Sequence, residues 1–248
     1  MTRTTRPTPH GRGARLLVAA AVAACALVGT AGAAPVPAPE RGVAVVLEPV
    51  SGRVFVHPDG VTTYRRLRAA ARMPVGTTVD AQQGAVRLTV GRDRRGGTWS
   101  AVFSEGKFTV TQPRHGEPVT TLQLTGPSVR DVCAVATASG KGKRKKVRRL
   151  WGDGKGRFRT SGHYSAATVR GTRWLTEDRC DGTLTRVVRG TVEVEDFTAV
   201  PEPAPPAAPP EPGGAAPPVA EPVPDAGAEA GGGVVVQAGG SYVARPGH

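Results

Sequence analysis

Residues 147–197 have the sequence VRRLWGDGKGRFRTSGHYSAATVRGTRWLTEDRCDGTLTRVVRGTVEVEDF, the longest run of the chain with the pattern of β-strands. Apolar and polar residues alternate between residues 184 and 194, and the apolar set is Leu184, Val188, Val192 and Val194. Because successive side chains of a strand point to opposite faces, this alternation predicts a half-buried antiparallel strand.

A turn precedes this strand. Asp181-Gly182 is a turn signal, because glycine accepts a positive φ and aspartate bonds its own backbone. Ahead of the turn, residues 167–176 are rich in Thr, Val and Trp, which suit a pleated surface. The stretch therefore predicts a β-hairpin.

The run TVRGTRWL, followed by DGTLTRVVRGTVEVED, resembles the core of FecR-like domains. PVSGRVFV and MPVGTTVDAQQGAVRLTV upstream resemble the opening of such a domain, and VVVQAGGSYVA resembles its closing strand pair. The residues on the motif strands are Val169, Arg170, Gly171, Thr172, Trp174, Gly190, Val192 and Val194. In its best-known setting the family implies a membrane-spanning regulator that relays a periplasmic signal to a sigma factor. Only fifteen residues precede the apolar segment that begins at Leu16, so we expect the module here and not the sigma-factor role.

Residues 1–33 have the pattern of a secretory leader. Four arginines precede an apolar segment from Leu16 to Val28, and Ala31-Gly32-Ala33 fits a small-residue cleavage site. We expect a cleaved signal peptide, export to the cell envelope or medium, and no transmembrane segment in the mature chain. The alternatives are a lipoprotein anchored at Cys25 and an uncleaved N-terminal anchor.

Residues 34–200 are expected to form one all-β domain, either a β-sandwich or a short solenoid-like β-roll of many short antiparallel strands. The 33 glycines and 23 prolines of the chain favour short strands and turns over helices. We expect an irregular loop at residues 65–72 and a turn at residues 152–156. The segment 201–233 is rich in Pro, Ala and Gly and is expected to be an extended linker. Residues 234–248 are predicted to form a hairpin that returns to the main sheet.

Cys133 and Cys180 are the two cysteines that follow the leader. An even number of cysteines in an exported chain predicts a disulfide. Closing this loop would stabilise the fold by about 4 kcal/mol on the chain-entropy model. Zinc would require nearby histidines, and His163 is the single one in the interval. We expect no metal and no other cofactor.

Residues 141–149, the basic run, have the sequence KGKRKKVRR. The net charge of the whole chain is +13, and residues 34–200 carry all of it, because the leader and the tail cancel. A positive field favours anionic partners. One interpretation is a solvated loop extended by self-repulsion. The other is an anion-binding site made of Lys141, Lys143, Arg144, Lys145, Lys146, Arg148 and Arg149.

The sequence lacks the common catalytic motifs. It contains neither G-x-S-x-G nor H-E-x-x-H, and Glu177, Asp178 and Asp181 are expected to be solvated acids paired with arginine. We therefore expect a non-catalytic module that binds an anionic cell-wall polymer or an anionic lipid surface. A protein-interaction or sensory domain and an enzyme acting on envelope glycans are the alternatives. Nucleic acid is a weaker expectation as a partner, although Trp151 lies close to the basic run.

Overall fold

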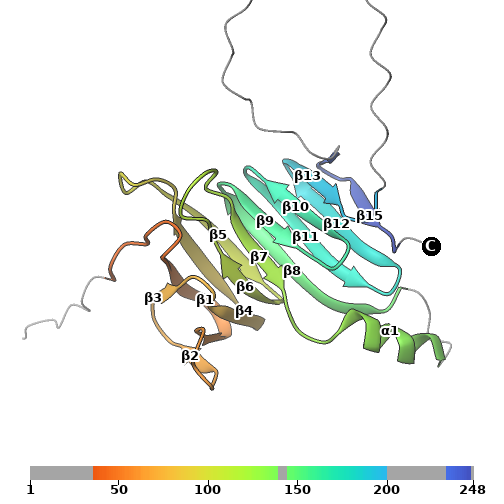
Figure 1. Cartoon of the computed structure of the whole chain (residues 1–248), viewed down its shortest axis with the longest axis horizontal. Coiled ribbons are helices and arrows are strands. Elements are labelled where there is room, and N and C mark those ends of the chain that lie inside the picture. Colours follow the sequence, from red (N-terminus) through yellow and green to blue (C-terminus); the bar gives the residue numbers. More distant parts are fainter. Residues whose placement is uncertain (1–35, 139–143, 200–232, 247–248) are drawn as a thin grey trace, which may run out of the picture. The chain divides into compact units, whose positions relative to one another are not determined.

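The computed structural model describes residues 36–138, 144–199 and 233–246, and fifteen strands with one short helix account for most of them. The predicted all-β fold is confirmed (Figure 1). The elements are β1 (Ala44–His57), β2 (Arg65–Leu67), β3 (Ala71–Pro74), β4 (Thr78–Gly91), β5 (Thr98–Ser104), β6 (Lys107–Thr111), β7 (Thr120–Leu124), α1 (Val129–Ala138), β8 (Lys146–Lys155), β9 (Phe158–Ser161), β10 (Ser165–Val169), β11 (Thr172–Arg179), β12 (Gly182–Arg189), β13 (Thr191–Asp196), β14 (Val234–Gln237) and β15 (Ser241–Ala244).

The strands form one nearly closed sheet whose order is β14-β13-β10-β9-β7-β6-β4-β5-β8-β11-β12-β15. The long strand β4 pairs with β5 through its second half and with β6 through its first residues, so the sheet divides there into two facing halves. β1 runs along the other edge of β4 and also pairs with β2 and β3. Every pairing is antiparallel except the parallel pair β7–β9.

The chain passes from one half of the sheet to the other at glycines. Gly171 separates β10 from β11 and Gly190 separates β12 from β13, with φ angles of 130° and 81°. Both glycines stand in the same tetrapeptide, V-R-G-T, and a Cβ on Gly190 would lie 2.8 Å from the carbonyl oxygen of Gly171. Positive φ and this close approach both require glycine. The predicted hairpin strands 167–176 and 184–194 are therefore each divided between the two halves.

This division explains why the alternation predicted the wrong face of the sheet for one residue, Val188. The alternation placed Val188 with the buried set, but its side chain is 50% exposed and Val187 is buried instead. The chain turns a corner at Gly190, so the parity of β13 does not extend back into β12. Val192 and Val194 are buried in the core, as the alternation predicts, and Leu184 is buried outside the core cluster.

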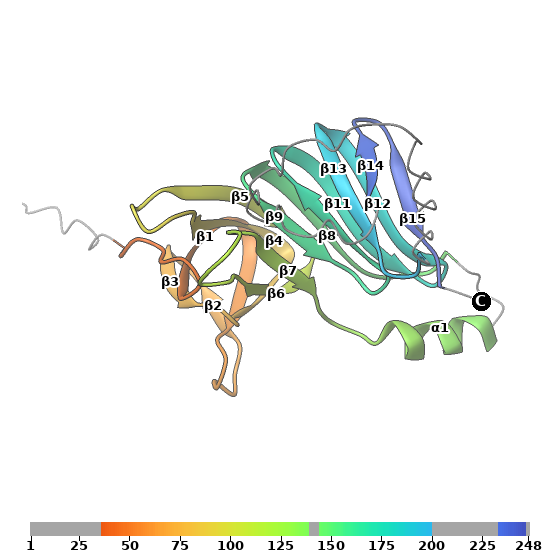
Figure 2. The ribbon, with the colours of Figure 1, turned by 45° about the horizontal axis from the view of Figure 1, so that its top comes forward.

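The core lies between the two halves (Figure 2). The rings of Phe103, Phe108, Phe158 and Trp174 are fully buried, and Phe103 contacts the other three with ring centroids 5.6–5.9 Å apart. The Thr160 hydroxyl on β9 accepts a 3.0 Å hydrogen bond from the Trp174 indole on β11. Aromatic contacts of this kind fix the separation of the two halves.

The one helix of the described residues, α1, was not predicted from the sequence, which indicated strands and irregular segments. α1 carries Cys133, which forms a disulfide with Cys180 just after β11, with Cα atoms 5.3 Å apart. The predicted disulfide is confirmed. Residues 129–138 have the sequence VRDVCAVATA, whose small apolar residues suit a helix as well as a strand.

Two predicted irregular segments are strands. Residues 65–67 and 71–74 form β2 and β3, which both pair with β1. Residues 152–155 belong to β8 and pair with β11 and β5, so the expected turn there is wrong. Gly152 and Gly154 leave room for residues of the adjacent strands, since a Cβ on Gly152 would lie 2.4 Å from the ring of Trp174 on β11.

The C-terminal strands complete both halves of the sheet. β14 pairs with β13, and β15 pairs with β12. The predicted leader, residues 1–33, lies outside the described residues, and so does the predicted linker up to residue 232. That segment joins two adjacent antiparallel strands, because Val194 on β13 faces Val234 on β14. It is therefore an insertion into a β-hairpin connection and does not link two domains.

Shortening this insertion is expected to stabilise the fold. Joining Ala199 directly to Gly231 leaves β13 and β14 their register while reducing the connection to a few residues. Loop-closure entropy predicts a gain of about 1.5–2 kcal/mol in the free energy of unfolding. Denaturant unfolding of the two proteins measures it. A less stable shortened chain would show that the insertion contributes contacts of its own.

Tyr242 holds β15 to the end of β13. Its hydroxyl donates a 2.6 Å hydrogen bond to Asp196, which raises the pKa of Tyr242 to about 12. Burial raises the pKa of Asp196, but hydrogen bonds from Thr198 and Tyr242 outweigh burial and lower it below its usual value.

A lowered folded-state pKa makes this contact dependent on pH. Asp196 contributes stability above its unfolded-state pKa of about 4, and the contribution is lost as the pH falls through the lower folded-state pKa. We expect Tyr242→Phe to reduce the free energy of unfolding at pH 7, and the difference from the wild type to shrink toward pH 2. Urea unfolding across this pH range tests it. A difference that is constant with pH would mean that the hydroxyl does not act through Asp196.

Candidate functional site

The described part of the basic run is largely neutralised by carboxylates. Lys146, Arg148 and Arg149 belong to β8 and not to a loop. Arg148 Nε lies 2.6 Å from Asp178, Arg149 Nη2 lies 2.6 Å from Glu105, and Lys146 Nζ lies 3.7 Å from Glu177. Arg144 and Lys145 are exposed, while Lys141 and Lys143 lie outside the described residues. Ion pairs within the protein therefore neutralise much of the positive charge that made this run a candidate binding site.

Two of the expected solvated acids are buried. Asp178 is fully buried and Glu177 is 2% exposed, which corrects the expectation that they are solvated. They belong to β11, and the strand places them on opposite faces. Asp181 is bound by the Arg179 guanidinium at 2.8 and 3.0 Å, as the local pairing predicts.

The FecR-like motif residues form the scaffold. Val169, Thr172, Trp174, Val192 and Val194 are buried. Gly171 and Gly190 make the corners between the two halves, and Arg170 is exposed. None of the motif side chains except Arg170 is available to a ligand on the surface.

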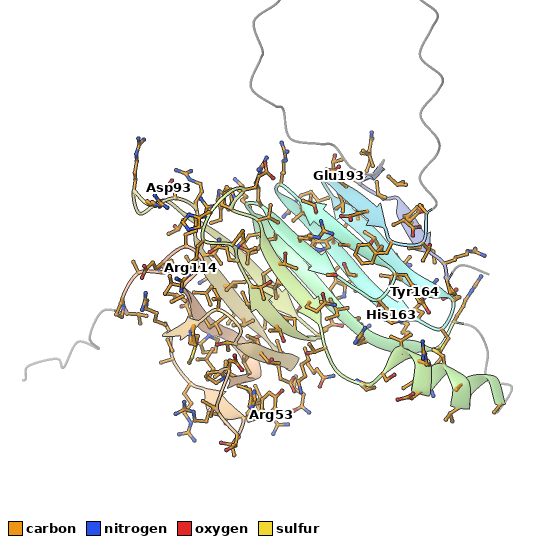
Figure 3. All side chains as sticks on the ribbon, viewed as in Figure 1. Arg53, Asp93, Arg114, His163, Tyr164 and Glu193 are labelled. Atoms are coloured by element: carbon orange, nitrogen blue, oxygen red, sulfur yellow. A yellow bond between two sulfur atoms is a disulfide. The ribbon has the colours of Figure 1, made fainter. Side chains whose placement is uncertain are left out.

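The strongest candidate site is a cluster of arginines at the other end of the sheet, which we call the arginine hollow. Arg41 precedes β1, Asp93, Arg94 and Arg95 lie in the β4–β5 turn, and Arg114 and His115 lie between β6 and β7. These residues line a cavity of about 420 Å³, and all of them except Arg95 also line an adjoining cavity of about 480 Å³, which Glu40 lines as well. Figure 3 shows Asp93 and Arg114 on this part of the molecule.

A buried glutamine brings these three segments together. The Gln112 side-chain carbonyl accepts a 3.0 Å hydrogen bond from the Gly42 amide. Its NH₂ group donates to the Gly91 carbonyl at 2.9 Å and to the Thr120 hydroxyl at 3.0 Å. One amide thus connects the β6–β7 segment that carries it with the turn before β1, the end of β4 and the start of β7. Arg41, Arg94 and Arg114 lie within three residues of Gly42, Gly91 and Gln112, respectively.

Backbone carbonyls hold two of the arginines. Arg41 donates to the carbonyls of Pro113 and Gly116 at 3.4 and 2.5 Å, and Arg114 donates to the Gly42 carbonyl at 3.3 Å. The Arg94 guanidinium lies 3.2 Å from Nδ1 of His115. Carbonyl and imidazole partners orient these groups without cancelling their charge, in contrast to the carboxylates around the basic run.

Asp93 is the one carboxylate residue that lines both cavities, and its oxygen atoms accept hydrogen bonds from the turn in which it lies. It accepts hydrogen bonds from the Gly97 and Arg95 amides at 3.0 and 2.9 Å and from Arg92 Nε at 2.9 Å. The Gly97 amide and the Arg92 side chain lower the pKa of Asp93, so it stays ionised. The four guanidinium groups therefore outnumber the negative charge in the hollow, and the arrangement suits an anion with several oxygen atoms.

The sequence contained little signal for this site. Its members come from segments around residues 41, 94 and 114, and the glutamine that connects them is an isolated polar residue between strands. Residues 92–97, RDRRGG, have the composition of a charged surface turn. Folding is what places arginines from three segments around one space.

Replacing Gln112 with leucine is expected to loosen the hollow. The change keeps the size of the side chain but leaves the Gly42 amide and the Gly91 carbonyl without their partner. A buried polar group left unpaired costs about 1–3 kcal/mol. Thermal unfolding measures this loss, and Gln123→Leu, on an exposed position of β7, is the control. Equal stability of the Gln112→Leu variant and the wild type would mean that the glutamine does not organise this end of the sheet.

Within the described ranges, no group of three or more His, Cys, Asp or Glu side chains is placed to hold a metal ion. No helix among the described residues is long and apolar enough to span a membrane. Comparisons with protein-family models, curated proteins and solved structures give no match for this chain.

Proposed function

We propose that this chain is a non-catalytic binding module of the cell envelope that recognises phosphate-bearing polymers or surfaces through the arginine hollow. The observation that carries the proposal is the convergence of Arg41, Arg94, Arg95 and Arg114 on one space. Backbone carbonyls orient Arg41 and Arg114, and the His115 imidazole lies beside Arg94, so these partners leave the positive charges uncancelled. The FecR-like resemblance and export through the leader are part of the same proposal and rest on the sequence.

The ligand chemistry follows from the guanidinium group. Arginine presents several N–H donors in a planar fork, which matches the oxygens of a phosphate group. A hollow of about 420 Å³ is large enough for one phosphate group with the sugar or polyol attached to it. A repeating phosphodiester polymer of the wall and the headgroup layer of an anionic membrane share this chemistry.

The competing site for the same ligand is the basic run. Of its five described basic residues, Arg148, Arg149 and Lys146 have carboxylate partners, so an anion would have to displace Glu105, Asp178 or Glu177. Asp178 is fully buried, and an anion cannot replace it without opening the core. The hollow requires no such displacement, which favours it as the binding site.

Two matched variants separate the sites. The hollow variant carries Arg94→Gln, Arg95→Gln and Arg114→Gln, and the run variant carries Lys143→Gln, Arg144→Gln and Lys145→Gln. Both remove three charges and leave every ion pair of the described residues intact. Binding is measured to inorganic polyphosphate and to vesicles of phosphatidylglycerol, with phosphatidylcholine vesicles as the neutral control, at several salt concentrations.

We expect the hollow variant to bind at least about tenfold more weakly than the run variant, which corresponds to a loss of about 1.4 kcal/mol. Each phosphate contact that is lost should also reduce the slope of log affinity against log salt by about one. Binding to polyphosphate alone identifies a polymer ligand, and binding to vesicles alone identifies a membrane. Equal weakening by the two variants, or no binding by the wild type, would reject the hollow as the site and favour a protein-interaction module.

A further inference from the structure

A second hollow lies on the outer face of the half formed by β5, β8 and β11. It has a volume of about 460 Å³ and is lined by Val102, Ser104, Glu105, Trp151, Gly152, Asp153 and Arg173. We call it the indole hollow, because the half-buried ring of Trp151 is its one aromatic surface. Its arginine, Arg173, is not part of the arginine hollow.

The strand register explains how these side chains come together. Val102, Asp153 and Arg173 form one row across the three strands, and Ser104 and Trp151 lie in the next row on the same face. Trp174, the neighbour of Arg173, points the other way into the core. The outer face of these strands thus presents one indole ring beside carboxylate, hydroxyl and guanidinium groups.

The two carboxylates are held in place and remain accessible. Glu105 lies 2.6 Å from Arg149, and Asp153 lies 2.6 Å from Arg189. The side chains of Glu105 and Asp153 are 46% and 43% exposed, so each keeps oxygen lone pairs available to a ligand. The Arg173 guanidinium lies 5.7 Å from the centroid of the Trp151 ring, near the outer limit of a cation–π contact.

This set of groups suits a neutral polyhydroxylated ring better than an anion. Two carboxylates beside the ring repel a phosphate, which argues against a nucleotide or a phosphodiester stacked on Trp151. Sugar hydroxyls donate to carboxylates and accept from guanidinium groups, while the C–H face of a pyranose packs on an indole. Apolar contact with a few oriented polar groups is the usual composition of a small-molecule site.

We propose that the indole hollow binds one pyranose ring of a neutral glycan, with the sugar stacked on Trp151. Asp153 and Glu105 accept hydrogen bonds from its hydroxyls, and Arg173 donates to a ring or acetamido oxygen after a small rotation away from the indole. The hollow is a binding subsite, and no bond is made or broken there. The ligand group proposed here is a neutral sugar, whereas the one proposed for the arginine hollow is anionic. The two proposals are independent, so an experiment can reject one of them and leave the other standing.

The test uses the full mature chain and two soluble probes, the tetramer of β-1,4-linked N-acetylglucosamine and the tetramer of β-1,4-linked glucose. Calorimetry and tryptophan fluorescence follow the titrations up to about 10 mM, a range that detects even weak single-ring sites. The variants are Trp151→Ala, Asp153→Asn and Arg173→Ala. The control is Trp99→Phe, because Trp99 packs against the core and does not line the hollow.

We expect the wild type and Trp99→Phe to bind at least one tetramer, with a change in fluorescence that is absent from Trp151→Ala. Each of the three variants should weaken binding by about tenfold or more, and Asp153→Asn keeps the test valid if Trp151→Ala does not fold. The variant of the arginine hollow, with Arg94→Gln, Arg95→Gln and Arg114→Gln, should bind the tetramers with the affinity of the wild type. Failure of the wild type to bind either tetramer, or unchanged binding by Asp153→Asn and Trp151→Ala, would overturn the proposal.

Discussion

Asp178→Ala is expected to destabilise the fold by about 3–5 kcal/mol, the usual cost of leaving one member of a buried ion pair alone. Oδ2 of Asp178 lies 2.6 Å from Arg148, and Oδ1 accepts hydrogen bonds from the His163 amide and the Thr183 hydroxyl at 2.8 and 2.6 Å. The change removes the partner of a guanidinium whose side chain is only 15% exposed. It also frees the turn between β9 and β10, where Figure 3 labels His163 and Tyr164.

The measurement is denaturant unfolding of the oxidised chain, with Glu48→Ala as the control. Glu48 pairs with Arg87 at 2.8 Å, but both side chains are nearly half exposed, and such surface pairs contribute about 0–1 kcal/mol. Similar losses for the two variants would show that burial adds nothing to the Asp178 pair. A double variant, Asp178→Ala with Arg148→Met, should recover part of the loss, because it removes both charges together.

Trp174→Ala is expected to cost about 3–5 kcal/mol, as large-to-small changes of buried aromatic residues do. The indole is fully buried, contacts Phe103 and donates a hydrogen bond to Thr160 on the opposite half of the sheet. Its removal leaves a cavity, and the glycine at position 152 has no side chain with which to fill it. The loss is therefore expected near the upper end of the range.

Thermal and denaturant unfolding measure this loss. Trp99→Ala is the matched control, since Trp99 is only partly buried at the edge of the same core, and we expect it to lose clearly less. Equal losses for the two tryptophans would contradict the assignment of Trp174 as the residue that joins the two halves. Thr160→Val tests the hydrogen bond by itself, with an expected loss of about 1 kcal/mol.

Most of the fold was predictable because strand patterns are local. Alternation, turn glycines and the two cysteines predicted an all-β chain with one disulfide, and both are confirmed. The corners were not predictable, because a strand that bends at Gly171 or Gly190 still has the composition of a continuous strand. The same effect placed Val188 on the wrong face.

The site was much less predictable. Counting charges along the chain selected residues 141–149, but the carboxylates that pair with this run come from Glu105, Glu177 and Asp178, and their proximity is a property of the folded sheet. The arginine hollow differs from the basic run, because its arginines are scattered along the sequence and are brought together by the fold. Its members are separated by up to about seventy residues in the sequence and meet only when Gln112 joins three segments.

The most direct test of the central claim is to observe the arginine side chains while a ligand binds. Side-chain Nε–Hε signals in NMR spectra of the ¹⁵N-labelled chain are assigned by substitution and followed during a titration with inorganic polyphosphate. The signals of Arg41, Arg94, Arg95 and Arg114 are predicted to shift together and to saturate at one ligand concentration. Shifts confined to Arg144, Arg148 and Arg149, with the hollow unchanged, would contradict the account.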